Sequence, residues 1–314
     1  MAPTILIVGA TGNTGKGVVD NLPQLLQKSK TLTHHKIIAL TRSAASPAAQ
    51  AITQIPGIEV EEQAWSEITP AWLRERDVER VFIASHNEPT QFSEESTFLV
   101  AALRAGVQYV VRISTTAANV FPDNDAYYPR THWAIEAMLE TPEFEALGWT
   151  SLQPMVFTAY IAGPAAQFIK GYRETGKQGT LALMCAGDAP AASIDPEEVG
   201  RFAANLLAED DPRKHYRAKY VLNGPEDYTG EDVVRMVEGH IGEKVKDVKF
   251  KDVSFVEHMA EASNYSKNVI RSIKYAPVTS WEGKTMAAGT SKEVIEIAPP
   301  ERTVAETLEA LLKA

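Results

Sequence analysis

The sequence predicts a doubly wound α/β fold, in which helices cover both faces of a parallel sheet, followed by a smaller α+β region. Two observations support this prediction. Short apolar segments alternate with helical patterns through the first half of the chain, and continuous apolar strands are typical of parallel sheets buried on both faces. A glycine-rich turn directly follows the first apolar segment. In such sheets ligands bind beyond the carboxyl ends of the strands.

The first half contains the elements of this sheet. Apolar and β-branched runs predict strands at 4–8, 36–40, 58–62, 80–84, 109–113 and 149–152. Apolar residues at helical spacing predict helices over 15–27, 72–76, 93–105 and 131–139.

The second half has a less regular pattern. Helices are expected over 168–175, 196–207, 231–240 (capped by Thr229), 254–261 and 304–312, and strands over 220–223 and 245–250. Residues 176–187 suggest a turn with short strands, and 262–292 an irregular, mobile region. We therefore expect a cofactor domain over 1–155. Residues 156–314 form a substrate-covering region packed on it, some of whose elements return to the first domain.

Composition excludes several classes of protein. The chain has 314 residues and a formal net charge of −10, whereas nucleic-acid binding needs clustered Lys and Arg. One cysteine, Cys185, cannot form an internal disulfide, and no Cys/His cluster offers zinc spacing, so no metal is expected. No apolar run reaches the about 20 residues of a membrane span. We expect a cytoplasmic monomer or homodimer that acts on a small molecule.

The glycine-rich turn is the strongest motif. It lies between the first strand and the first helix, and its expected contact residues are Gly9, Thr11, Gly12, Asn13, Thr14 and Gly15. Glycines at this spacing allow a tight turn, close approach to a pyrophosphate and close helix–strand packing, while the helix N-terminus offers free N–H groups. The motif predicts a dinucleotide site.

The end of the second strand distinguishes between NAD and NADP. An NAD site usually has an acidic residue here, but this strand ends in Thr41, Arg42 and Ser43. A guanidinium suits a 2′-phosphate in charge and geometry, and the two hydroxyls are further donors. We therefore predict NADP(H).

Other contacts are predicted from the ends of the later strands. The expected cofactor contacts there are Ser85, His86, Asn87, Ser114, Thr115, Pro154, Met155 and Phe157. Trp133, Tyr160 and Phe168 are expected to line an apolar substrate pocket.

The chain resembles the NmrA-like branch of the atypical short-chain dehydrogenases/reductases. The resemblance is carried by the three glycines, by Thr41-Arg42, and by a segment that reads Tyr128-x-x-x-His132-x-x-x-Glu136. Gln153-Pro154 and the helix start at Asp195 are also similar to family segments. The resemblance implies a Rossmann fold that binds NADP(H).

One departure concerns catalysis. Ordinary short-chain dehydrogenases use Tyr-x-x-x-Lys, but no tyrosine here has Lys four residues later, and His132 takes that place relative to Tyr128. Residues four apart share a helix face, so both side chains can face the cofactor, with His132 holding the ribose. A neutral histidine activates tyrosine less than lysine does, which argues against ordinary carbonyl reduction.

Arg130 adds a permanent cation beside the expected nicotinamide position, where it can orient the substrate or stabilise negative charge. Here the chain resembles NmrA-like reductases of fungal prenylated-indole alkaloid pathways, some of which guide an intramolecular Diels–Alder closure. The expected acidic partner is absent from 160–166. The resemblance implies a reductase or cyclase of secondary metabolism, acting on a bulky, apolar, nitrogen-containing substrate, with Arg130, His132 and Tyr128 as catalytic residues. The alternatives are an NADPH quinone or enone reductase, and a regulator that senses NADP(H) without catalysis.

Overall fold

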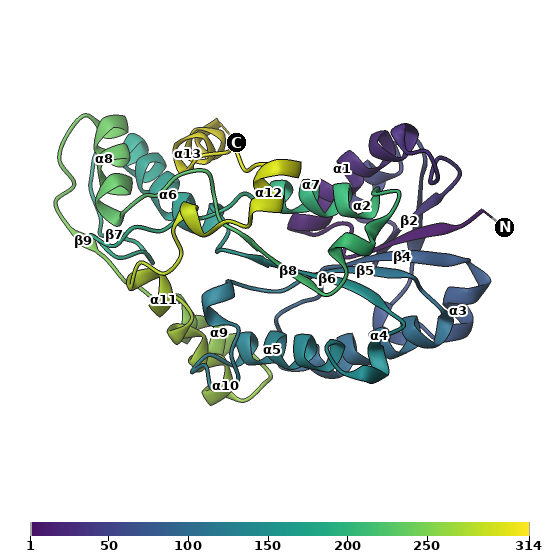
Figure 1. Ribbon diagram of the computed structural model, residues 1–314. Coiled ribbons are helices and arrows are strands. Elements are labelled where there is room, and N and C mark those ends of the chain that lie inside the picture. Colours follow the sequence, from purple (N-terminus) through teal and green to yellow (C-terminus); the bar gives the residue numbers. More distant parts are fainter. Residues whose placement is uncertain (1, 314) are drawn as a thin grey trace.

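A seven-stranded parallel sheet forms the centre of the molecule, as a computed structural model describes it for residues 2–313 (Figure 1). Its order is β3-β2-β1-β4-β5-β6-β8, so the chain starts in the middle and winds outward in both directions. The strands are β1 (Thr4–Val8), β2 (Lys36–Thr41), β3 (Ile58–Glu62), β4 (Val78–Ile83), β5 (Tyr109–Ile113), β6 (Gly148–Pro154) and β8 (Ala218–Leu222). The predicted doubly wound α/β class is confirmed.

Two helical layers cover the sheet because alternate strand residues point to opposite faces. Ile5 and Ile7 of β1 belong to one core cluster, and Leu6 and Val8 to the other. The first face carries α1 (Asn13–Lys28), α2 (Pro47–Ile52) and α7 (Pro196–Leu207); the second carries α3 (Pro70–Glu75), α4 (Gln91–Ala105) and α5 (Tyr127–Leu139) (Figure 1).

The C-terminal layer extends the first face. Its helices are α6 (Ala159–Thr175), α8 (Gly230–Ile241), α12 (Lys292–Ile297) and α13 (Val304–Lys313), beside a small parallel sheet of β7 (Leu181–Ala182) and β9 (Val248–Lys249). A capping box starts α8: the Thr229 side chain accepts from the Asp232 backbone, and the Asp232 carboxylate accepts from the Thr229 backbone. The proposed boundary at 155 falls directly after β6, while α7 and β8 return to the sheet from beyond it.

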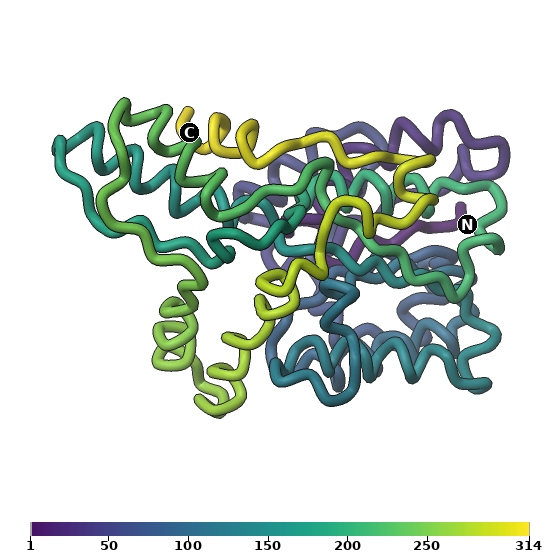
Figure 2. Tube along the Cα trace, turned by 60° about the vertical axis from the view of Figure 1, so that its left-hand side comes forward, coloured from purple at the N-terminus to yellow at the C-terminus, as the bar shows by residue number. Residues whose placement is uncertain are grey.

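A helical arm links the two faces. It contains α9 (Phe255–Ala262), α10 (Lys267–Arg271) and α11 (Val278–Trp281), and 3-10 turns lie at Ser272–Tyr275 and Ala287–Gly289. Figure 2 shows this arm leaving the C-terminal layer and returning to it. Ala260 and Ile270 form a buried cluster with Tyr127 of α5. The expected irregular region over 262–292 is therefore wrong, because packing against α5 stabilises helices too short to be stable alone.

Several boundaries also differ from the prediction. Helix α5 begins at Tyr127 rather than 131, since Pro129 lies in its first turn, where proline is tolerated. Helix α6 begins at Ala159 rather than 168 and continues through Pro164. The strand expected at 245–250 shortens to Val248–Lys249, which pair only with β7. No helix between residues 2 and 313 has the length and apolarity needed to cross a bilayer.

Candidate active site

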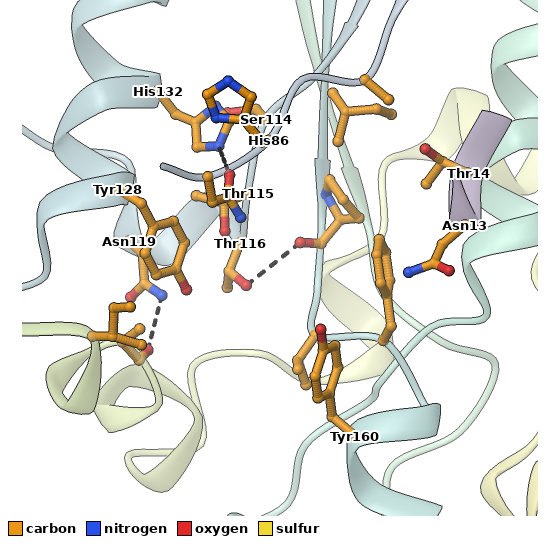
Figure 3. Close-up of a pocket in the computed structure, with 18 of the residues that line it drawn as sticks. Asn13, Thr14, His86, Ser114, Thr115, Thr116, Asn119, Tyr128, His132 and Tyr160 are labelled. Carbon is orange, nitrogen blue, oxygen red and sulfur yellow. Dashed lines mark hydrogen bonds between the residues drawn. The ribbon is translucent and has the colours of Figure 1, made fainter. Parts of the chain in front are cut away.

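A cavity of about 810 Å³ opens at the carboxyl ends of β1, β2, β4, β5 and β6. The strands place polar side chains on one side of it, and the helical arm supplies much of the opposite wall. The predicted site residues that line it are Gly9, Thr11, Gly12, Asn13, Thr14, Thr41, Arg42, Ser85, His86, Asn87, Ser114, Thr115, Tyr128, His132, Pro154, Met155, Phe157 and Tyr160. Figure 3 shows Asn13 and Thr14 across this space from Tyr128 and Thr115.

The turn between β1 and α1 requires glycine for steric reasons. Gly9 has φ +83°, and a Cβ there would lie 2.6 Å from the Ala84 carbonyl oxygen. A Cβ on Gly15 would lie 2.0 Å from the Gly9 carbonyl oxygen, so Gly15 packs behind the turn and does not line the cavity. Gly12 caps α1 without any side-chain cap. The first N–H groups of a helix have no acceptor within it, so this end of α1 can bind an anion.

At the end of β2, Arg42 is exposed and lines the cavity. Within residues 2–313 it forms no ion pair, so its charge is available to a ligand. The Thr41 hydroxyl accepts from the Ser43 N–H and donates to the Ser43 carbonyl, which shapes the turn. Ser43 itself does not line the cavity.

The loop after β4 is tied to α4. The Ser85 hydroxyl donates to Glu95 (2.7 Å), and His86 Nε2 lies 2.9 Å from a Glu94 carboxylate oxygen. His86 Nδ1 accepts from the Glu88 N–H, so the Nε2 proton faces Glu94. These side chains shape the cavity wall through contacts within the protein.

Ser114 at the end of β5 and Tyr128 on α5 are hydroxyl-bearing residues that line the cavity. Ser114 is only 5 % exposed, and its Oγ has no partner among the described residues. Burial raises the pKa of Tyr128 to about 12, although its hydrogen bond with Thr115 opposes the increase. The phenol is therefore protonated at neutral pH, and the site holds a proton donor beside an unsatisfied hydroxyl.

His132 is held neutral behind this wall. Its Nδ1 lies 2.9 Å from Nη2 of Arg112 and its Nε2 lies 3.1 Å from Oδ1 of Asn87. Burial, and then the Arg112 charge, lowers the pKa of His132 well below its ordinary value. The imidazole is thus a neutral group whose two ring nitrogens face protein partners, and its expected contact with the ribose stays a prediction.

An ion network whose centre is fully buried supports His132. Arg112 Nε donates to Glu95 (2.6 Å), and its Nη1 donates to Ser151 (2.9 Å). Ser151 in turn donates to Glu136, whose carboxylate also lies 3.5 Å from Lys219 Nζ. Both buried carboxylates are therefore paired with the buried Arg112, and Glu136 also faces the partly exposed Lys219.

Besides Gly15 and Ser43, three predicted residues lie away from the cavity. Arg130 donates to the backbone carbonyls of Asn124 and Asp125, so its guanidinium anchors the preceding loop. Trp133 is 38 % exposed on α5, since it follows His132 and points elsewhere around the helix. Phe168 packs against the main core. None of these three side chains lines the cavity.

The sequence did not predict the apolar wall opposite the strands. Its residues are Met184, Phe255, Met259, Tyr265, Ile270 and Trp281, most of them from the helical arm. No sequence motif marks these residues as part of a site, because only the tertiary fold brings them to the cavity. The buried network had a detectable signal, because Arg112 is the one charged residue in the apolar strand Tyr109–Ile113.

Residues 1–294 match the model of the NmrA-like family. The chain belongs to the NmrA-like family. A similar protein is a (4-alkanoyl-5-oxo-2,5-dihydrofuran-3-yl)methyl phosphate reductase of Streptomyces griseus. The two sequences are 25% identical over 242 residues, which cover 77% of this chain and 75% of the relative.

Solved structures share the NmrA-like architecture. An NADPH-dependent quinone oxidoreductase of Escherichia coli, in complex with NADPH, superposes with a TM-score of 0.72 at 21% identity over 98% of this chain and 99% of its own. NmrA, a negative transcriptional regulator, in complex with NADP, has a TM-score of 0.69 at 14% identity over 100% of this chain and 96% of its own. The NmrA-like fold thus occurs in both reductases and a regulator.

Proposed function

We propose that this NmrA-like protein is an NADP(H)-dependent reductase of a bulky, uncharged, apolar substrate. The observation that carries the proposal is that one cavity joins an anion-binding turn and the unpaired Arg42 to the Tyr128 and Ser114 hydroxyls. The first two features suit a dinucleotide phosphate, and the hydroxyls suit proton transfer and orientation.

The described residues fit NADP(H). The glycine turn has no Cβ where a pyrophosphate approaches, and α1 has no side-chain cap to compete with it. Arg42 would hold the 2′-phosphate, and the hydroxyl of Ser114 has no protein partner to lose. When bound, NADPH supplies a hydride. The Tyr128 phenol keeps its proton at neutral pH and is placed to donate it to the reduced substrate.

The scarcity of charged side chains in the cavity lining favours an uncharged substrate. Among the described lining residues, Arg42 is the only Lys or Arg and Glu88 the only Asp or Glu. Arg42 lies at the nucleotide end, so the substrate end has no cation for a phosphate group. The substrate class therefore differs from the phosphate ester of the Streptomyces relative, and quinones or enones fit better.

The indole-alkaloid and cyclase assignments suggested by the resemblance depend on Arg130 facing the substrate. Its guanidinium is bonded to loop carbonyls instead, and no other observation favours cyclisation over hydride transfer. A regulator without catalysis would bind NADP(H), but NADPH would not be oxidised whichever acceptor is added. Binding and turnover assays distinguish this case from a reductase.

The Arg42→Ala variant tests the cofactor. Hydrogen bonds to charged groups contribute about 1.5–3 kcal/mol, so we expect NADPH to bind about tenfold to a hundredfold more weakly, with NADH affinity unchanged. Isothermal titration calorimetry measures both. The control is Arg173→Ala, which removes an exposed cation from α6 outside the cavity. Equal NADPH affinity in wild type and Arg42→Ala would contradict the assignment.

A substrate series tests the proposed charge preference. NADPH oxidation, followed by absorbance, is expected with neutral quinones and enones. Matched compounds that carry a phosphate should react at least about tenfold more slowly, since burying an unpaired anion is costly. Equal rates for the two series would contradict the charge argument. Tight NADPH binding without NADPH oxidation in the presence of any tested acceptor would favour the regulator.

A further inference from the structure

A chain of buried contacts runs from the interior of the sheet to the cavity. Glu95 on α4 holds Arg112 on β5, Arg112 donates to Nδ1 of His132 on α5, and His132 Nε2 meets Oδ1 of Asn87. The backbone carbonyl of Asn87 also accepts from the Tyr127 hydroxyl. The Oδ1 atom and the backbone carbonyl of Asn87 are therefore both held from behind the cavity wall.

The chemistry of these partners determines where each proton lies. A guanidinium has only donors, so Nδ1 of His132 must be the unprotonated acceptor. The Gln91 amide nitrogen lies 3.4 Å from the same atom, and its other contacts are to Ser85 and the Glu95 carboxylate, which fix its orientation. Nε2 therefore carries the proton and donates it. The Asn87 atom that faces His132 must then be Oδ1, and the amide nitrogen must point away.

The free end of this amide reaches the cavity. Asn87 is exposed and lines the cavity, and its amide nitrogen has no partner within residues 2–313. Its loop follows β4, which pairs with β1. The glycine turn touches the same loop, since the Gly9 backbone packs against Ala84. A donor at Asn87 is thus close to the proposed dinucleotide phosphates.

We propose that Arg112 and His132 are positioning residues that fix the Asn87 amide with its N–H groups toward an acceptor oxygen of the bound dinucleotide. The proposal rests on the proposed function for the identity of the ligand. The orientation of the amide does not depend on it, because protein contacts alone determine that orientation.

The charges around His132 are consistent with one fixed tautomer. Arg112 faces it from β5, Gln91 and Glu95 from α4, and Asn87 from the loop after β4, while Glu136 lies one helical turn further along α5. The carboxylates contact Arg112 rather than the imidazole. No acceptor faces Nδ1, so protonation there would oppose two donors.

Nuclear magnetic resonance of the ligand-free protein tests the tautomer directly. Spectra of ¹⁵N-histidine-labelled wild type contain seven histidines, and comparison with the His132→Gln variant identifies the His132 signals. We expect a neutral ring protonated on Nε2 that does not titrate between about pH 5 and 8. A ring protonated on Nδ1, or one that titrates in this range, would overturn the proposal whether or not NADPH binds.

Matched variants test the positioning of Asn87. Asn87→Asp still accepts from His132 but loses the donor, and should bind NADPH at least about tenfold more weakly. His132→Leu removes both of its hydrogen bonds and should cause a similar loss. His132→Gln, whose amide can accept from Arg112 and donate to Asn87, should recover most of that loss. Equal affinity in wild type, Asn87→Asp and His132→Leu would overturn the proposal.

The Arg112→Lys variant tests the first link. A lysine ammonium cannot span Glu95, Ser151 and His132 in the way the guanidinium fork does. We expect His132 to lose its single tautomer and to titrate in the accessible pH range. A His132 spectrum unchanged from wild type would contradict the role of Arg112.

If this variant does not fold, the wild-type tautomer and the comparison of His132→Leu with His132→Gln still decide the proposal. Absence of NADPH binding in wild type would refute the proposed function and leave the tautomer result intact.

Discussion

Replacing Gly200 with alanine is expected to destabilise the protein strongly. Gly200 lies on α7 where it crosses α1, and a Cβ there would lie 2.1 Å from the Thr14 carbonyl oxygen and 2.7 Å from the Gly17 Cα. These neighbours are backbone atoms, so the two helices must separate. Overpacking typically costs about 1–3 kcal/mol, and contact with the rigid backbone of α1 places this variant at the upper end. Denaturant unfolding measures the change.

The same variant should also weaken NADPH binding, since Thr14 lies in the first turn of α1 and lines the cavity. The matched control is Gly239→Ala on α8, where a Cβ meets nothing within 4 Å. That variant should be neutral or more stable by about 1 kcal/mol because alanine favours a helix. Equal stability of the two variants would show that α1 and α7 do not pack as closely as described.

Removing the Tyr128 hydroxyl is expected to have the largest effect on activity. If the phenol donates a proton, Tyr128→Phe should lower kcat about a hundredfold or more, in the range typical of general acids. NADPH affinity and stability should change little. In wild type, burial raises the pKa of Tyr128 to about 12. Since an acid is active below its pKa, loss of this proton should not reduce kcat at or below about pH 9.

Steady-state kinetics on a neutral quinone, together with calorimetry for NADPH, measures these effects. The control is Tyr216→Phe, which removes a hydroxyl that donates to the Gln108 carbonyl outside the cavity. Loss of NADPH affinity in Tyr128→Phe with kcat retained would instead assign the hydroxyl to cofactor binding. Unchanged kcat would place proton donation elsewhere.

The cavity residues at the glycine turn and at the end of β2 could be predicted because their signals are local. Gly9 must adopt a positive φ, and Arg42 follows a strand whose end determines its position, so short-range sequence is sufficient. The strands of the sheet were predictable for the same reason, since their apolar runs are continuous.

The apolar wall of the cavity could not be predicted in this way. Phe255, Met259 and Trp281 reach the cavity only because the helical arm packs against Tyr127, a contact between segments far apart in sequence. For Arg130, the position in the sequence was misleading. Its position in the chain suggested a role beside the ligand, but its guanidinium contacts the carbonyls of the preceding loop, and sequence spacing does not determine such a rotamer.

Burial keeps the only cysteine of the chain unreactive. Cys185 is buried in the cavity wall, and burial raises the pKa of its thiol to about 12. Quinones and enones are Michael acceptors, which alkylate thiolates rather than thiols. If the protein reduces such compounds, the protonated Cys185 thiol in the cavity wall should therefore not be alkylated by the substrate during repeated turnover.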